Sequence, residues 1–179
     1  SEGGTSQTAV HKGTTNAKLT YSNSNSNLDS AGLIYFYGGG YRNGHTGNTN
    51  IELNHTGNSK QVYLFCGSND GLHEGTASTI ISNLGDAREI TVFGGSKNGQ
   101  FKGDTNLDIN PASAASSKLT LYGGSQSIEH TSASGGKSVS NVKLRGSGSI
   151  DTLQINGGNR HGSFSGDVTH TIDTRLVTN

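Results

Sequence analysis

A degenerate repeat of about 28 residues runs through most of this chain and constrains its fold more than any other feature. Its most regular copy is residues 89–110, EITVFGGSKNGQFKGDTNLDIN, where two alternating apolar runs and one short run are separated by Gly-rich turns. One position near the end of the copy is aliphatic throughout: Leu19, Leu53, Ile81, Ile109, Leu144 and Ile172. Successive members are 34, 28, 28, 35 and 28 positions apart. Such recurrence of one residue class indicates stacked structural units.

Two other sets of positions recur with the same spacing. A run before each Gly turn carries two apolar residues two apart: Ile34/Phe36, Val62/Leu64, Ile90/Val92, Leu119/Leu121 and Leu153/Ile155. A short run after the turn carries a ring: His11, His45, His73, Phe101, His130 and Phe164. Two residues later a glycine is expected to allow positive φ at a corner: Gly13, Gly47, Gly75, Gly103 and Gly166. The runs have period 2 and are short, which predicts strands, and no stretch sustains the helical period.

These patterns predict an all-β protein, a right-handed parallel β-helix (solenoid) of about five coils of ~28 residues with three short strands per coil. Each coil would stack on the previous one at the strand spacing of about 4.8 Å. An antiparallel sandwich is the rival, but it does not require the same residue class at the same offset in every copy. Residues 1–179 are expected to form a single β-helix segment, and because the chain starts and stops within a repeat, we expect it to be part of a longer array.

Composition limits the core and the partners. Hydrophobic residues make up 28% of the chain, so each strand can contribute only a few inward side chains to a thin core. The formal net charge is zero, which argues against nucleic acid or an anionic membrane as a partner. No apolar run reaches the roughly 18 residues of a membrane helix, so no membrane insertion by this segment is expected. The single Cys66 excludes an internal disulfide and a cysteine metal site.

Two copies exceed the regular period, and the extra residues fall in loops. The first excess lies in SNSNSNLDSAG, residues 22–32, and the second in TSASGGK, residues 131–137. Insertions in solenoids fall in loops that often lie on a binding face. Neutral drift in tolerant loops explains the same observation.

Aromatic residues recur immediately before the Gly turns and provide the candidate ligand-binding set. These are Tyr37, Phe65, Phe93 and Tyr122, with Tyr35 and Tyr63 two residues earlier in the first two copies. Because the intervening positions point inward, these rings are expected to point outward as a ladder that could bind sugar rings. The alternatives are that loops fold over the rings, or that ring-on-ring stacking is itself their purpose.

Other groups of residues can be considered as metal-binding or catalytic sites, and none of them is predicted to be one. His45 and His73 could bridge a metal, but the pattern supplies no third ligand and Phe replaces His in the same column, so a stacked ring that fills a corner is favoured and no metal is predicted. Charged candidates for catalysis do not converge in the repeat: Asp70, Glu74, Asp86 and Arg88. Phosphate-binding, nucleophile-elbow, dinucleotide and calcium-nonapeptide motifs are missing. No catalytic residue and no cofactor are therefore predicted.

Two copies, ITVFGGSKNGQFKGDTNLDIN and IYFYGGGYRNGHTGNTNIELN, carry a family resemblance. They resemble repeats of large bacterial surface β-helix proteins, which include autotransporter passenger domains and wall-attached adhesins of Gram-positive cells. The resemblance implies an extracellular or bacterial cell-surface location and binding to a host or sister-cell surface glycan or protein, or self-association. It transfers no functional residue, and the last copy departs from it with Asn156 in place of the aromatic residue.

We therefore predict a non-enzymatic segment of a cell-surface or secreted adhesin that mediates attachment or self-association through outward ladders and protruding loops. A carbohydrate-binding or carbohydrate-active β-helix, lyase-like or hydrolase-like, is one alternative. A passive stalk or spacer is the other.

Overall fold

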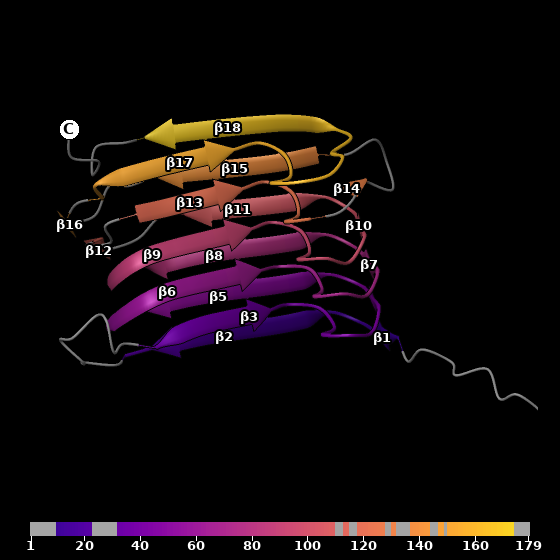
Figure 1. Ribbon diagram of the computed structural model, residues 1–179, viewed down its shortest axis with the longest axis horizontal. Helices are drawn as coiled ribbons and strands as arrows, with labels where there is room; N and C mark the ends of the chain where they lie inside the picture. Colours follow the sequence, from indigo (N-terminus) through magenta and orange to yellow (C-terminus); the bar gives the residue numbers. More distant parts are fainter. Residues whose placement is uncertain are drawn as a thin grey trace, which may run out of the picture.

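The computed structural model describes residues 10–22, 32–109, 113–114, 118–127, 130–131, 137–143, 147–148 and 150–173. Within these ranges the chain forms strands and no helix, and every strand pairing is parallel (Figure 1). No helix among the described residues could therefore cross a membrane. The stacked parallel sheets confirm the all-β solenoid architecture and contradict the antiparallel sandwich.

The strands belong to three main sheets, each of which takes one strand from each successive turn of the chain. The front sheet in Figure 1 contains β3 (Leu33–Tyr37), β6 (Asn58–Phe65), β9 (Asp86–Phe93), β13 (Lys118–Tyr122) and β17 (Thr152–Asn156). The back sheet contains β2 (Thr15–Tyr21), β5 (Thr49–His55), β8 (Ala77–Asn83), β11 (Thr105–Ile109), β15 (Lys137–Lys143) and β18 (Asp167–Asp173). The corner sheet contains β1 (His11–Lys12), β4 (His45–Thr46), β7 (His73–Glu74), β10 (Phe101–Lys102) and β14 (His130–Thr131).

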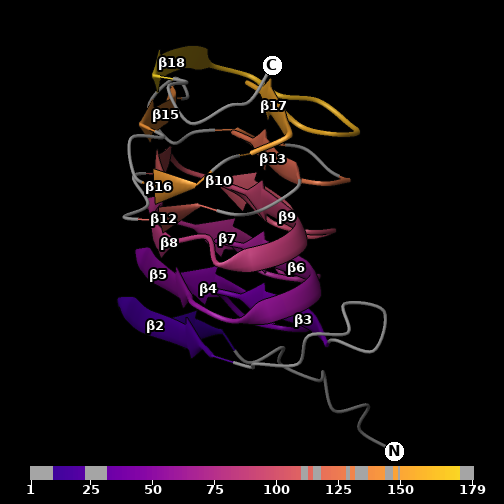
Figure 2. The same cartoon turned by 90° about the vertical axis from the view of Figure 1, so that its left-hand side faces the viewer.

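A fourth, two-stranded sheet was not expected from the repeat. It pairs β12 (Ser113–Ala114) with β16 (Ser147–Gly148) at the side of the molecule opposite the corner sheet (Figures 1 and 2). The three-strand pattern therefore describes the N-terminal part of the stack better than the C-terminal part. Most of residues 22–32 and 131–137, the two predicted loop excesses, lie outside the described residues.

The front and back sheets enclose the apolar core. Alternate residues of the front sheet point inward, and Val62, Leu64, Ile90, Val92 and Leu119 are completely buried. The aligned front-sheet positions pair in register, for example Val62 with Ile90 and Ile90 with Leu119, as the repeat predicts. Aliphatic residues of the back sheet meet them in the same cluster: Leu53, Ile81, Leu107 and Ile109. Burial of these side chains is the main stabilising term of the stack.

One assignment in the back-sheet column is wrong. Val142, not Leu144, pairs with Ile109, and Val142 in turn pairs with Ile172. Leu144 itself lies outside the described residues. Val142 and Leu144 are two positions apart, so both satisfy a period of 2, and alternation alone cannot choose between them.

The corners depend on close approach between successive backbones. Gly47, Gly75 and Gly103 have positive φ, as expected, and a Cβ on Gly75 would lie 2.1 Å from the carbonyl oxygen of Gly47. At the Gly-rich turn that follows each front-sheet strand, a column of buried serines binds the backbone of the neighbouring coil. The Ser96 hydroxyl accepts a hydrogen bond from the Ser68 N–H at 3.0 Å, and the Ser125 hydroxyl accepts one from the Ser96 N–H at 2.9 Å. The third residue of the GGS turn is therefore a link between coils.

Candidate functional site

The outer face of the front sheet carries the predicted aromatic residues in two columns. The ring column comprises Tyr37, Phe65, Phe93 and Tyr122, whose rings stack in this order with centroids 5.2, 4.8 and 4.7 Å apart. Phe65 and Phe93 are each only 1% exposed, so the expectation of a ladder open to solvent is wrong for these two. Both faces of each inner ring are covered by neighbouring rings. This arrangement fits the alternative interpretation, in which the rings serve to stack on one another.

The ends of the ring column are only half-buried. Tyr37 is further covered by the turn segments, because Tyr41 packs edge-on against it at 5.6 Å and the Lys97 ammonium lies 6.0 Å from its ring centre. The ring column therefore serves mainly to pack one coil on the next.

The second column is open to solvent at its N-terminal end. Tyr35 is 52% exposed and stacks on the half-buried Tyr63 with ring centroids 4.9 Å apart. The next strands toward the C-terminus carry Thr91, Thr120 and then Gln154 in register with Tyr63. The column thus changes from large rings to smaller side chains on the C-terminal side of Tyr63.

This change in size leaves a hollow of about 170 Å³ in the outer face, which we call the notch. The notch is lined by Tyr63, Glu89, Thr91, Lys118, Thr120, Tyr122, Gln154 and Arg160. One face of the Tyr63 ring is occupied by Tyr35, and no ring among the described residues stacks on the other. An aromatic face beside polar groups is an arrangement that suits an amphipathic ring such as a sugar.

Charged groups flank the notch, and most of them are already paired. Glu89 accepts a hydrogen bond from the Gln61 side-chain amide at 3.1 Å, and its other oxygen lies 3.3 Å from the Lys118 ammonium. Arg160, from the turn after β17, also lines the notch, and its backbone N–H binds the Ser125 carbonyl at 3.0 Å. Glu89 and Lys118 cancel each other's charge, so Arg160 gives the lining formed by the described residues a net positive charge.

Two hydroxyl groups complete the lining. Burial raises the pKa of Tyr63, helped by the nearby Glu89 carboxylate and opposed by Arg160, so the phenol stays protonated and can donate. Thr120 is 4% exposed, and its buried Oγ1 has no hydrogen-bond partner among the described residues. A buried hydroxyl without a partner is costly, which marks this position as one that a bound group could satisfy.

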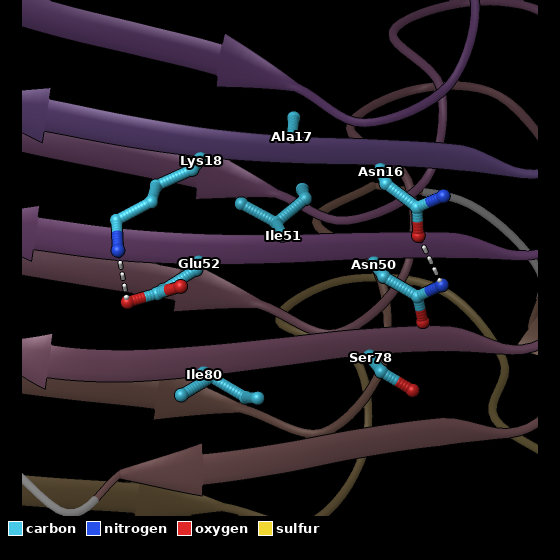
Figure 3. Close-up of a pocket in the computed structure, with 8 residues that line it drawn as sticks. All are labelled: Asn16, Ala17, Lys18, Asn50, Ile51, Glu52, Ser78 and Ile80. Atoms are coloured by element: carbon cyan, nitrogen blue, oxygen red, sulfur yellow. Dashed lines mark hydrogen bonds and ion pairs between the residues drawn. The ribbon is translucent and has the colours of Figure 1, made fainter.

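A larger hollow of about 440 Å³ lies on the back sheet, and Figure 3 shows its lining. Its polar side chains bind one another: the Asn50 amide donates to Asn16 at 2.9 Å, and Lys18 pairs with Glu52 at 3.2 Å (Figure 3). Ile80 is the exposed apolar residue there, and no aromatic ring lines the hollow. Since these ladders satisfy themselves, the notch is the stronger candidate despite its smaller volume.

The ring positions of the corner sheet form a stack, as the corner-filling interpretation predicts. His45, His73 and Phe101 are buried with ring centroids 4.9 and 4.7 Å apart. Burial, together with the neighbouring His11, lowers the pKa of His45, so this imidazole is held neutral. Among the described residues no three His, Cys, Asp or Glu side chains are placed to hold a metal ion.

The charged residues considered for catalysis lie in three separate segments of the chain. Asp70, in the turn between β6 and β7, accepts hydrogen bonds from the amides of Asn69 and Asn98 at 2.8 and 3.1 Å. Glu74 lies in β7, 4.0 Å from the Lys102 ammonium. Asp86 and Arg88 belong to β9 on the front sheet. Asp70 and Glu74 thus have separate polar partners, and Asp86 and Arg88 lie on a third segment.

The sequence patterns identified part of the notch. They identified Tyr63 and Tyr122, but missed Glu89, Lys118 and Arg160. A signal for the notch was present, because Thr91 and Thr120 follow Tyr35 and Tyr63 at equivalent positions of the repeat.

Comparison with known proteins adds no identity to this geometry. No family model, no curated protein and no solved structure matches the chain.

Proposed function

We propose that this chain is a non-enzymatic binding solenoid, a segment of a bacterial cell-surface or secreted adhesin, that attaches to a glycan through the outer face of the front sheet. The observation that carries the proposal is the face of Tyr63 that no described ring covers, on the side of the two threonines of the notch. A sugar ring presents apolar C–H groups to such a face and hydroxyls to the surrounding polar groups. Tyr35, stacked on Tyr63, and Tyr122, at the side of the notch, would extend the contact surface.

The architecture suits attachment by several weak contacts. A solenoid presents equivalent positions coil after coil, so a polymeric ligand or several copies of the protein can gain avidity from sites of low affinity. Within the proposal, the solenoid is right-handed with about five coils of ~28 residues, because parallel crossover connections are right-handed in about 98% of cases. An experimental structure with left-handed crossovers would overturn this element.

A passive stalk is the second candidate. It is favoured by the back sheet, where side-chain ladders such as Asn16–Asn50 and Lys18–Glu52 satisfy one another. A stalk needs regular stacking and no ligand, so it predicts that changes in the notch leave attachment unaltered.

The test is binding of the purified chain to an array of bacterial and host glycans, for the unchanged protein and the variant Tyr63→Ala. The matched control is Tyr41→Ala, which removes an equally large ring that is 60% exposed on a turn outside the notch. We expect Tyr63→Ala to abolish the signal and Tyr41→Ala to retain it, with unchanged circular dichroism in both. Retention of binding by Tyr63→Ala would refute the proposed site, and absence of binding by the unchanged protein would favour the stalk.

A further inference from the structure

The geometry points to an acidic sugar as the ligand of the notch, with Arg160 holding its carboxylate. This inference rests on the proposed function, since it names the class of glycan that the same face would take. It is carried by the size of the notch, by a positive charge that no described residue pairs, and by the Thr120 hydroxyl, which lacks a hydrogen-bond partner in the same part of the chain.

The size of the notch limits the ligand to a small group. Its volume of about 170 Å³ is well below the roughly 300–1,000 Å³ of pockets that enclose drug-sized molecules. The notch therefore suits a single ring, or the substituents of one ring, of a longer chain that runs over the face. The Tyr63 face forms one wall, and Gln154 lies at the opposite end of the column.

The charge of the notch selects an anion. Both oxygens of Glu89 are engaged, one by Lys118 and one by Gln61. By contrast, no described residue forms an ion pair with the Arg160 guanidinium. A guanidinium presents donors in a planar fork that matches a carboxylate in two parallel hydrogen bonds, so Arg160 is suited to the acidic group of a uronic or sialic acid.

Neutral groups of the notch match the hydroxyls of such a sugar. The Tyr63 phenol stays protonated, and Thr120 Oγ1 lacks a partner that a ligand hydroxyl could supply. This oxygen is sealed from solvent in the structure, so a ligand hydroxyl reaches it only when the side chains that cover it move aside. The site thus combines one charged contact with contacts to neutral hydroxyls.

The experiment compares acidic oligosaccharides with carboxyl-reduced forms of the same compounds. The probes are galacturonate, alginate and hyaluronate oligomers and sialyllactose, titrated into the unchanged chain and followed by calorimetry or by NMR shifts of the tyrosine rings. We expect at least one acidic probe to bind roughly tenfold or more tightly than its reduced form, because a charged hydrogen bond is lost on reduction. Raising the ionic strength should weaken the acidic form selectively.

Two variants assign the effect to the notch. Arg160→Gln should reduce the acidic probe to the affinity of its reduced form, whereas Arg42→Gln, which removes the same charge from another exposed turn outside the notch, should change nothing. Thr120→Val, which keeps the shape and removes the hydroxyl, should weaken both forms of the probe.

The outcomes separate the inference from the function on which it rests. Equal affinity of acidic and reduced probes, or an unchanged Arg160→Gln, overturns the acidic specificity while sensitivity to Tyr63→Ala still supports glycan binding. If no acidic probe binds better than its reduced form, the inference is wrong. If neither form of any probe binds and the glycan array is also silent, the proposed function fails with it.

Discussion

Phe93→Ala offers a direct check of how the ring column holds the coils together. Phe93 is 1% exposed and lies between Phe65 at 4.8 Å and Tyr122 at 4.7 Å, so its removal opens a cavity and breaks two stacked contacts. Buried Phe→Ala changes cost about 3–5 kcal/mol, and each aromatic pair contributes about 0.5–1.5 kcal/mol beyond burial. We therefore expect a loss near the upper end of that range. Tyr35→Ala, at an exposed position with one stacked contact, should cost about 1 kcal/mol.

The assay is equilibrium urea unfolding followed by circular dichroism, with native-state hydrogen exchange to locate the loss. Because a solenoid is stabilised by nearest-neighbour contacts, Phe93→Ala should accelerate exchange in β6, β9 and β13 before it does so in distant coils. Phe93→Leu, which fills part of the cavity without a ring, should fall between the unchanged chain and the alanine variant. A cost of Phe93→Ala no larger than that of Tyr35→Ala would refute the role of the ring column in packing one coil on the next.

Three further predictions concern buried polar groups. Burial lowers the pKa of His45 and of His55, so the unfolded state binds protons more strongly than the folded state. The urea midpoint should therefore be constant above about pH 6.5 and fall as the pH drops below it. A midpoint that rises on acidification would contradict this. Burial raises the pKa of Cys66 to about 11, so a thiol reagent at neutral pH should label it only as fast as the fold opens, and rapid labelling of the native chain would be inconsistent with the packing. Ser96→Ala should leave the buried N–H of Ser68 without its acceptor and so lower the free energy of unfolding, measured with urea, by about 1–3 kcal/mol. An unaltered midpoint would show that the hydroxyl does not link the coils.

The stacking of the coils could be predicted from sequence because the same residue class recurs in the same place. Inward columns such as Ile34, Val62 and Ile90 need only a period and an alternation, and both can be read from one chain. The wrong choice of Leu144 in place of Val142 shows the limit of this reasoning. An alternating pattern does not distinguish residues two positions apart, whereas the strand register does.

The exposure of the aromatic residues could not be predicted in the same way. Alternation assigns Phe65 and Phe93 to the outer face, but both are buried there, each between two stacked rings. Burial at these positions depends on side chains from other coils, which the pattern of one coil does not contain. The full lining of the notch was harder to predict, because Arg160 reaches it from a turn at a distant position in the sequence.

The most direct test of the central claim fills the notch without removing any group that binds elsewhere. Thr91→Tyr places a third ring in the column next to Tyr35 and Tyr63, where the repeat already accepts tyrosine. We expect a chain of unaltered circular dichroism and stability that no longer binds any glycan recognised by the unchanged protein. Undiminished glycan binding by a folded Thr91→Tyr variant would show that the notch is not the binding site.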